Sequence, residues 1–592
     1  MHVLTLPRAE YPRPHFVRSR WTCLNGTWQF AREEVSVWHA PMDVQWESEI
    51  IVPFAPEAPA SGLADERFHA VVWYRRTFDM PALADGERLL LHFGAVDYAA
   101  TVWVNGIEVA SHEGGYTPFS ADITDAATRN GAQTVVVRAE DDPTDLTKPR
   151  GKQDWEREPH AIWYPRTSGI WQTVWLEPVP ATAIRTVAWT PNIERYEIAL
   201  EGTTSGPLST GAHLQVVMWL GDKLLADDTY AVIMGEVSRR IAFSDPGIDD
   251  SRSDILWSPE HPRLINFTLR LLDASGVVLD TVEGYTALRD VGVLGNRFLL
   301  NGRSRRLLFV LDQGYWPEGG LTAPTDEDFI RDIELVKAMG FNGVRKHQKI
   351  EDPRYLYHAD RIGILVWEEM PSTYRFTRTS VTRVLREWQE VIARDRDHPC
   401  IIVWVPFNES WGVPHLPGVA AQRDYIQTAY HLTKTLDATR AVIGNDGWEH
   451  VATDIVGIHD YDTDVARLAR RYASPEAVPH LFADEQPAGR VLALGNTQIS
   501  ALPLMLTEFG GIAFSADPAH TWGYTRAANA EGFTAQYTQL IQTVRKLPIL
   551  AGFCYTQFAD TYQEVNGLLY ADRTPKIPLD VIANANYGPL PT

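Results

Sequence analysis

The stretch 401–412, IIVWVPFNESWG, decides the fold of this chain. Its first four residues are apolar without alternation, which is typical of a strand buried on both faces in a parallel sheet. The run stops at a proline, and Asn408 and Glu409 follow at its carboxyl end. A second apolar run, 502–507, ends in the same way at Glu508. Each strand is therefore expected to deliver one glutamate to the same edge of a sheet.

Two carboxylates at the carboxyl ends of parallel strands match the pair that retaining glycosidases use, one as acid/base and one as nucleophile. About 100 residues separate Glu409 from Glu508, which leaves room for two or three strand–helix units of a (β/α)8 barrel. Either glutamate alone is equally well explained as a surface charge or a neighbour of a helix N-cap. Their joint occurrence favours the catalytic pair.

The composition limits the partners. The chain has 592 residues, enough for roughly three or four domains, and a net charge of −22, which argues against nucleic acid or an anionic membrane. Aromatic residues make up 11% of the chain, and flat rings are the surfaces on which sugars stack, although large β-rich cores also use them. We therefore expect a carbohydrate substrate.

The sequence gives no sign of a secreted or membrane-spanning protein. The start of the chain lacks a basic segment followed by an apolar run, and no stretch of 18 or more apolar residues occurs. Cys23, Cys400 and Cys554 are far apart, so neither a disulfide framework nor a zinc site is indicated. We expect a cytoplasmic protein.

Residues 1–180 have the period-two pattern of an antiparallel β-sandwich or jelly roll. Four runs predict strands: 71–78, 88–93, 101–104 and 133–137. Asn105-Gly106 after the third run predicts a hairpin turn. Residues 141–164 lack apolar periodicity, and a polar loop of this length is usually either functional or disordered.

Residues 181–290 continue in the all-β style. Strands are predicted at 185–189, 196–200, 213–220 and 267–272. About seven short strands in about 100 residues favour an immunoglobulin-like sandwich.

Residues 291–592 change to apolar strands that alternate with helical periodicity. Strands are predicted at 307–311, 343–345, 364–367, 401–405, 441–443, 455–459, 504–507 and 552–557. Helices are predicted at 326–339, 353–361, 381–394, 420–436 and 533–545. Repeated βα units of this number predict a (β/α)8 TIM barrel, which completes a multidomain fold of two β domains and one catalytic barrel.

Polar and aromatic side chains gather at the predicted strand ends of the barrel, where the catalytic rim of such barrels lies. Besides the two glutamates, the candidates for substrate binding are Asp312, Gln313, Arg345, His347, Glu369, Asn408, Trp411, His459, Tyr461 and Gln557. Any one of these residues alone is more often part of an ion pair that closes a barrel. Their recurrence on strand after strand favours a binding site.

The run 394–404, RDRDHPCIIVW, leads into Asn408-Glu409 and closely resembles the acid/base signature of glycoside hydrolase family 2, the β-galactosidase, β-glucuronidase and β-mannosidase group. Weaker similarities are LNGTW at 24–28, VNG at 104–106, GIW at 169–171, LNG at 300–302, GFNGVR at 340–345 and DRTPK at 572–576. Together they cover all three predicted domains.

The resemblance implies that Glu409 is the general acid/base and Glu508 the nucleophile of a retaining exo-glycosidase. Glu409 must then carry a proton when the substrate arrives and act as a base afterwards. The resemblance also implies that Asn408 binds the sugar 2-hydroxyl, that Tyr461 donates a hydrogen bond to the nucleophile, and that Arg345 braces Glu508.

Three departures from the family pattern concern the substrate. His347 stands one position early after Arg345, and Thr556 replaces a tryptophan that commonly lies under the sugar. Leu568 stands where glucuronidases have the lysine of an Asn-x-Lys pair for the sugar carboxylate. β-Glucuronidase is therefore disfavoured, and a neutral terminal sugar is expected. A β-galactoside comes first, followed by an unusual pyranoside, a β-galactofuranoside or an arabinofuranoside.

We expect no cofactor and no required metal. A catalytically silent carbohydrate-binding protein and a transglycosylase are the rival functions. The sequence leaves open the sugar, its linkage and the oligomeric state, including a homo-oligomer.

Overall fold

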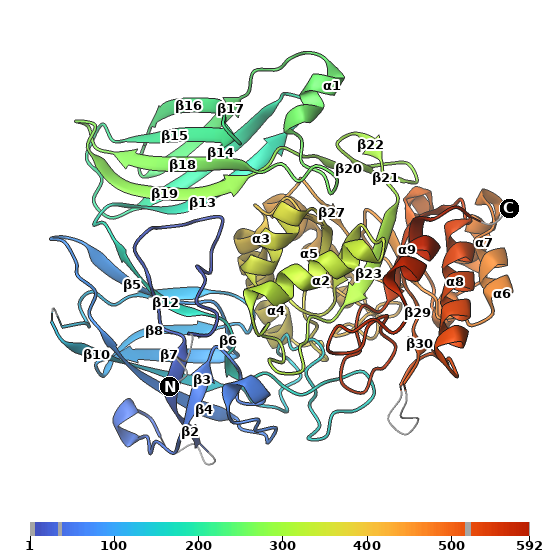
Figure 1. Ribbon diagram of the computed structural model, residues 1–592, viewed down its shortest axis with the longest axis horizontal. Coiled ribbons are helices and arrows are strands. Elements are labelled where there is room, and N and C mark those ends of the chain that lie inside the picture. Colours follow the sequence, from blue (N-terminus) through green and yellow to red (C-terminus); the bar gives the residue numbers. More distant parts are fainter. Residues whose placement is uncertain (1–5, 34–37, 129, 496, 516–521, 591–592) are drawn as a thin grey trace.

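The computed structural model describes residues 6–33, 38–128, 130–495, 497–515 and 522–590. Two β-sandwiches come first in the chain, and a (β/α)8 barrel beside them forms the carboxyl-terminal half (Figure 1). This arrangement confirms the predicted fold class. In the described ranges, no helix combines the length and the apolar character needed to cross a membrane.

Two facing sheets form the first sandwich around an apolar core. The larger has the order β3 (Ser48–Val52), β2 (Gly26–Glu33), β4 (Val71–Asp79), β10 (Ala132–Glu140), β7 (Ala99–Val104) and β8 (Ile107–Glu113). The smaller has the order β1 (Thr22–Cys23), β12 (Val174–Val179), β5 (Arg88–Phe93) and β9 (Phe119–Asp122), and β6 (Val96–Asp97) pairs with β11 (Gly169–Ile170). The predicted hairpin is confirmed, because Asn105 and Gly106 join β7 to β8 with φ values of 51° and 82°.

The second sandwich packs three strands on four, as the immunoglobulin-like pattern predicts. One sheet is β13 (Ala183–Asn192), β14 (Glu197–Ser205) and β17 (Glu236–Ala242); the other is β16 (Lys223–Ala231), β15 (His213–Leu220), β18 (Ile265–Leu272) and β19 (Val278–Thr286). Helix α1 (Asp249–Arg252) lies between β17 and β18, and the small sheet β20 (Val291–Leu294), β21 (Arg297–Leu300) and β22 (Arg303–Ser304) leads to the barrel. The predicted domain limit at residue 180 falls between β12 and β13, and the limit at residue 290 falls between β19 and β20.

Eight parallel strands form the barrel. They are β23 (Leu307–Asp312), β24 (Gly343–Lys346), β25 (Leu365–Glu369), β26 (Ile401–Val405), β27 (Ala441–Val442), β28 (Val456–His459), β29 (Leu504–Gly510) and β32 (Leu550–Thr556). The short strands β30 (Ile512–Ala513) and β31 (Thr525–Arg526) pair outside the barrel. In the ladder, β23 pairs with both β24 and β32, so the first and last barrel strands of the chain lie side by side, and the hydrogen-bonded order runs from β27 to β28.

The helices surround these strands. They are α2 (Asp326–Ala338), α3 (Pro353–Ile362), α4 (Arg378–Asp395), α5 (Ala420–Leu436), α6 (Val465–Arg471), α7 (Val478–Ala483), α8 (Ala530–Arg545) and α9 (Leu579–Tyr587). The sequence did not predict α6, α7 or α9. Helices α6 and α7 each bury a single side chain, Leu468 and Leu481, which is too little to produce a helical period.

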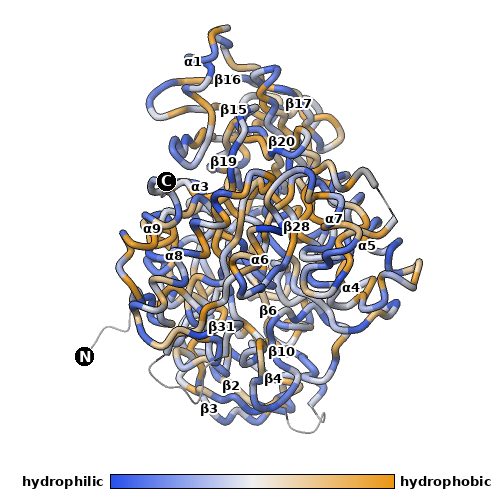
Figure 2. Tube along the Cα trace, turned by 90° about the vertical axis from the view of Figure 1, so that its right-hand side faces the viewer, coloured by the Kyte–Doolittle hydropathy of each residue, from blue (hydrophilic) through white to orange (hydrophobic). Residues whose placement is uncertain are grey.

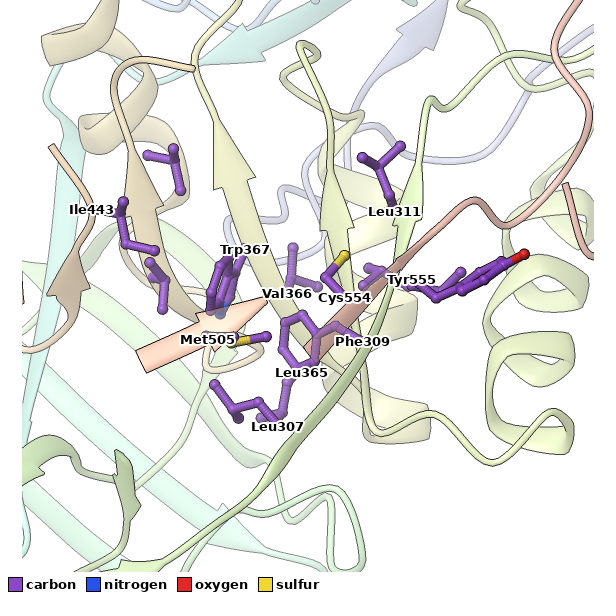
Figure 3. Packing of buried hydrophobic residues seen from close by; sticks show 14 of the residues in the cluster. Leu307, Phe309, Leu311, Leu365, Val366, Trp367, Ile443, Met505, Cys554 and Tyr555 are labelled. Carbon is purple, nitrogen blue, oxygen red and sulfur yellow. The ribbon is translucent and has the colours of Figure 1, made fainter. Parts of the chain in front are cut away.

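Large side chains from different strands fill the inside of the barrel (Figure 3). Leu307 and Phe309 of β23 meet Trp367 of β25, Met505 of β29 and Cys554 of β32, and all five are buried. This packing explains why the strands are apolar throughout instead of alternating.

The second sandwich is attached near the amino-terminal end of β26. The buried guanidinium of Arg289 donates to the carbonyl oxygens of Pro399 and Ile401 at 3.1 and 2.9 Å, and the Tyr285 hydroxyl donates to Asp360 Oδ2 at 2.8 Å. Figure 2 shows barrel elements such as β28 and α6 between the second sandwich at the top and the first sandwich at the bottom. The opposite, carboxyl-terminal rim is left for the residues described below.

We expect Trp404→Ala to destabilise the barrel by about 3–5 kcal/mol, because the indole is fully buried in the stretch that decides the fold. Urea unfolding followed by far-UV circular dichroism measures the change. The control is Val419→Ala, just before α5. Val419 is 37% exposed, so this substitution should change the free energy of unfolding by no more than about 0.5 kcal/mol. Equal midpoints for the two variants would contradict the expectation.

Candidate active site

The backbone after β26 turns sharply to present Glu409. Glu409 and Ser410 adopt left-handed φ values of 52° and 58°, which residues other than glycine rarely do. Contacts from the segment after β27 hold this turn: the Glu409 N–H donates to the Asp446 carbonyl at 2.9 Å, the Ser410 N–H to Asn445 Oδ1 at 3.0 Å, and the Ser410 hydroxyl to Glu449 Oε2 at 2.7 Å. Strained conformations of this kind persist only where surrounding structure imposes them, and they concentrate at functional sites.

Glu409 and Glu508 meet at the carboxyl-terminal rim. One carboxylate oxygen of each and a ring nitrogen of His459, at the end of β28, lie within 4.8 Å of one another. His459 Nδ1 is 2.7 Å from Glu409 Oε1, and its Nε2 is 3.5 Å from Glu508 Oε1. The two strands thus bring the two glutamates face to face, with one imidazole in contact with both.

Arg345 is the buried cation of the site. Its guanidinium contacts Glu369 Oε2 at 2.6 Å, Asp446 Oδ2 at 3.0 Å and Glu508 Oε1 at 3.0 Å. It also donates to Asn408 Oδ1 at 2.8 Å. One planar cation with five donors therefore joins groups from four strand ends besides its own.

These contacts fix the charges. Burial alone would raise the pKa of Glu508, but His459, Arg345 and His347 outweigh it and lower that pKa. Burial also opposes the charge of Glu369, yet Arg345 lowers the pKa of Glu369 to about 2. Burial would lower the pKa of His459, but Glu508 and the hydrogen bonds to Asp446 and Glu409 raise it to about 10. At neutral pH the ring is therefore an imidazolium beside the carboxylates of Glu508 and Asp446.

Both oxygens of Glu508 are held. Arg345 binds Oε1, and the Tyr461 hydroxyl donates to Oε2 at 2.7 Å. Tyr461 itself stacks on Tyr524 with ring centroids 3.3 Å apart, and its hydroxyl is 3.0 Å from Thr556 Oγ1. These contacts fix the direction in which the Glu508 carboxylate points.

Asn408 has a free donor. Its Oδ1 accepts from Arg345, which orients the amide, while its buried Nδ2 has no hydrogen-bond partner among the described residues. A buried amide donor without a partner is costly, so this group is set to bind a ligand.

His347 and Trp411 border the same cluster. His347 Nδ1 lies 3.0 Å from Glu369 Oε1 and 3.9 Å from Glu508 Oε1. The Trp411 ring lies 6.4 Å from the His347 ring and 5.5 Å from the Tyr374 ring. Two of the predicted residues therefore line the wall next to the glutamates.

The remaining candidates lie further from the glutamates. Gln313 Nε2 donates to Gln557 Oε1 at 2.8 Å, directly after Thr556 at the end of β32. Asp312 pairs with Lys346 at 2.7 Å, and the Lys346 ammonium lies 3.8 Å from the centre of the Tyr355 ring of α3. Asp312 thus belongs to an ion pair on the helix side of the strands, and among the described residues it hydrogen-bonds Gly314 and Lys346, not either glutamate.

Sequence reasoning missed four residues of the site: Lys152, Asp446, Tyr524 and Glu564. Asp446 is the one that a pattern could have revealed, because GNDGWE at 444–449 follows a predicted strand in the same way as the other polar strand ends. Lys152 comes from the first sandwich, and no local pattern places it at the barrel.

Glu409, His459 and Glu508 are the one set of donors with metal-ligand spacing found in the described ranges. Because the His459 ring is an imidazolium at neutral pH, it offers a lone pair to a cation only after losing its proton. The expectation of no required metal stays a prediction.

Comparison with known proteins identifies two matching family models. "Glycosyl hydrolases family 2, TIM barrel domain" matches residues 320–588, and "Glycosyl hydrolase 2 galactose-binding domain-like" matches residues 64–172. A β-galactosidase from Thermoanaerobacter pseudethanolicus is 29% identical over 58% of this chain, and the chain spans about half of that relative, 46% of its length. A β-glucuronidase from Felis catus is 25% identical over 74% of this chain and 70% of its own length.

Among solved structures, a Bifidobacterium dentium β-glucuronidase superimposes with a TM-score of 0.77 at 20% identity, covering 98% of both chains. At this level of identity the likeness concerns the fold, which agrees with the two sandwiches and the barrel described above.

We expect the wild-type protein to lose stability between pH 6 and 9.5 relative to His459→Asn. The folded pKa of His459, about 10, lies above the unfolded value near 6.5, so the bound proton stabilises the fold fully below about pH 6.5 and less as pH rises toward 10. The difference in the free energy of unfolding should be on the order of a few kcal/mol.

Urea titrations of both proteins at the two pH values measure this difference. His480→Asn is the control, because the His480 side chain is 69% exposed. Parallel pH profiles for the wild type and His459→Asn would show that the His459 proton is not linked to folding.

Proposed function

The chain belongs to glycoside hydrolase family 2, and on that premise we propose that it is a retaining exo-glycosidase that removes a terminal neutral sugar, with a β-galactoside as first choice. The observation that carries the proposal is the close approach of the Glu409 and Glu508 oxygens, within 4.8 Å. Retaining enzymes hold their carboxyl groups about 5–5.5 Å apart, whereas inverting enzymes leave about 6.5–9.5 Å for a water molecule. The short separation supports double displacement.

In the first step, a carboxylate oxygen of Glu508 attacks the anomeric carbon while the bond to the leaving oxygen breaks. The lowered pKa of Glu508 keeps it ionised, and the contacts with Arg345 and Tyr461 fix its direction. Positioning the nucleophile in this way removes much of the entropy cost of the reaction.

Glu409 protonates the leaving oxygen. It shares a hydrogen bond with the His459 imidazolium at 2.7 Å, so the pair holds a proton close to the rim. In the second step Glu409 takes a proton from water, which attacks the same carbon and releases Glu508.

Asn408 supports the transition state. Its unpartnered Nδ2 can donate to the sugar 2-hydroxyl, a contact that strengthens as positive charge develops on the ring. Because Arg345 holds the amide oxygen, the donor is oriented before the sugar arrives.

A uronic acid is the second candidate sugar, because relatives and solved structures include β-glucuronidases and β-galacturonidases. The residue at the position of the glucuronidase lysine, Leu568, carries no charge for a sugar carboxylate, which favours a neutral sugar. A panel of nitrophenyl glycosides, pairing galactoside with galacturonide and glucoside with glucuronide, tests the choice. If the protein hydrolysed only the uronides, the uronic acid would replace the neutral sugar as first choice.

We expect Glu508→Gln to lose turnover of aryl glycosides by several orders of magnitude, because an amide cannot form the glycosyl ester. A fluorosugar that matches the hydrolysed substrate should leave a covalent adduct on Glu508 of the wild type, detectable by mass spectrometry of peptides. Glu327→Gln, an exposed residue of α2, is the matched control and should keep full activity. Near-normal turnover by Glu508→Gln would refute the nucleophile and favour a non-catalytic binding protein.

We expect Glu409→Ala to lose about 10²–10⁴-fold in kcat on a substrate with a poor leaving group, which needs protonation, and less on a dinitrophenyl glycoside. Added azide should restore turnover of the dinitrophenyl substrate, because the small anion can attack the glycosyl ester without a base. The product is then a β-glycosyl azide, identified by NMR. Absence of both rescue and the azide product would assign the acid/base role to another group.

A further inference from the structure

The long polar loop 141–164 of the first sandwich reaches the rim of the barrel. The backbone N–H groups of Arg150 and Gly151 donate to the Ser372 carbonyl at 3.1 and 3.2 Å, and the Tyr374 hydroxyl donates to the Gly151 carbonyl at 2.6 Å. A Cβ atom at Gly151 would lie 2.2 Å from the carbonyl oxygen of Gln348, so only glycine permits this approach. The residue after this contact is Lys152.

Lys152 carries an ammonium group that the protein leaves largely unsatisfied. Its side chain is only 4% exposed, and in the parts of the chain that the structure describes Nζ makes no hydrogen bond. The ammonium lies 5.6 Å from the centres of the Tyr164 and Trp411 rings. The ammonium therefore keeps hydrogen-bond donors that a ligand can use.

The nearest anion to Lys152 is Glu564, on the segment after β32. Their Nζ and Oε2 atoms are 3.9 Å apart, beyond hydrogen-bond distance, and the Glu564 side chain is also only 4% exposed. The Tyr164 hydroxyl donates to the same Oε2 and fixes the carboxylate. The two charges are therefore held close together but not in direct contact.

This pair belongs to the same site as the catalytic glutamates. Burial raises the pKa of Glu564. The charges of Lys152 and His347 lower this pKa, and the charge of Glu508 raises it, so these groups are close enough to act on the Glu564 carboxyl group. Trp411, whose ring borders the Lys152 ammonium, follows Glu409 by two residues and borders His347. The Lys152–Glu564 pair thus lies beside the site, where the loop of the first sandwich meets the barrel.

A hydroxyl group fits between these two charges better than a carboxylate does. A hydroxyl oxygen accepts a hydrogen bond from an ammonium and donates its own proton to a carboxylate at once. A sugar carboxylate at the same place would accept a hydrogen bond from Lys152. It has no proton to donate to Glu564, however, and the two negative charges would repel each other.

We propose that Lys152 and Glu564 together bind one ring or exocyclic hydroxyl of the terminal sugar and so select a neutral sugar over the corresponding uronic acid. This inference rests on the proposed glycosidase function and names the feature of the substrate that the site recognises. Lys152 and Glu564 are specificity-determining residues and take no part in bond cleavage.

The first test is binding of monosaccharides, which does not require turnover. Galactose, glucose and mannose are each compared with their uronic acids by NMR titration of the wild type, Lys152→Met and Glu564→Gln. We expect the neutral member of at least one pair to bind more tightly than its uronic acid. Each variant should lose about 10–100-fold in affinity for it, the range for hydrogen bonds to charged groups. Glu564→Gln should bind the uronic acid more tightly than the wild type does.

Glu158→Gln is the matched control, because this exposed glutamate lies in the same loop. It should leave both affinities unchanged. Tighter binding of a uronic acid than of its neutral partner by the wild type, lost in Lys152→Met, would overturn the proposal and make Lys152 a carboxylate receptor. The proposal would also be overturned if both variants bound the neutral sugars as tightly as the wild type does. The same holds if the wild type bound no neutral sugar.

The second test is turnover, and it separates this inference from the proposed function. On the best nitrophenyl glycoside, Lys152→Met should lower kcat/KM about 10–100-fold, and the loss should vanish on the analogue that lacks the recognised hydroxyl. Equal losses on parent and deoxy substrates would overturn the hydroxyl contact alone. A wild type that binds the neutral sugar through Lys152 but hydrolyses no glycoside would remove the proposed function and retain the Lys152–Glu564 pair.

Discussion

The buried guanidinium of Arg345 is the interaction on which the site depends. Glu369, Asp446 and Glu508 are almost completely buried, and three carboxylates could not remain ionised there without a counter-charge. The same cation orients Asn408. Because these groups come from separate strands of the barrel, the charges meet only when those strands have packed together. The rim is therefore organised before any sugar arrives.

The environments of the two glutamates differ as their proposed roles require. Both oxygens of Glu508 are bound, and its pKa is lowered, so it is fixed and ionised. The Glu409 side chain is 17% exposed, and within the described ranges its carboxylate contacts His459 through a single oxygen. A group that must first give and then take a proton needs such access to water. Two identical side chains thus acquire different chemistry from their surroundings.

The sequence predicted elements that local patterns determine. Strand β26 and helix α5 have the predicted bounds, because a doubly buried strand and an amphipathic helix each leave a clear signal. Glu409, Glu508, Arg345 and Tyr461 were found because parallel strands bring their ends to one rim. Lys152 and Glu564 were not, since their meeting depends on how a loop of one domain packs on another. Asp446 was missed although it follows the predicted strand 441–443, because its ion pair with Arg345 joins two separate strands and leaves no local signal.

Through the loop that ends at Tyr164, two domains contribute to one site. The reacting groups lie at the ends of barrel strands. Part of the wall around them comes from the first sandwich, which has its own apolar core. Substitutions in that loop can reshape the pocket without disturbing the Arg345 charges. The wall of the site and its charged centre can therefore diverge separately during evolution.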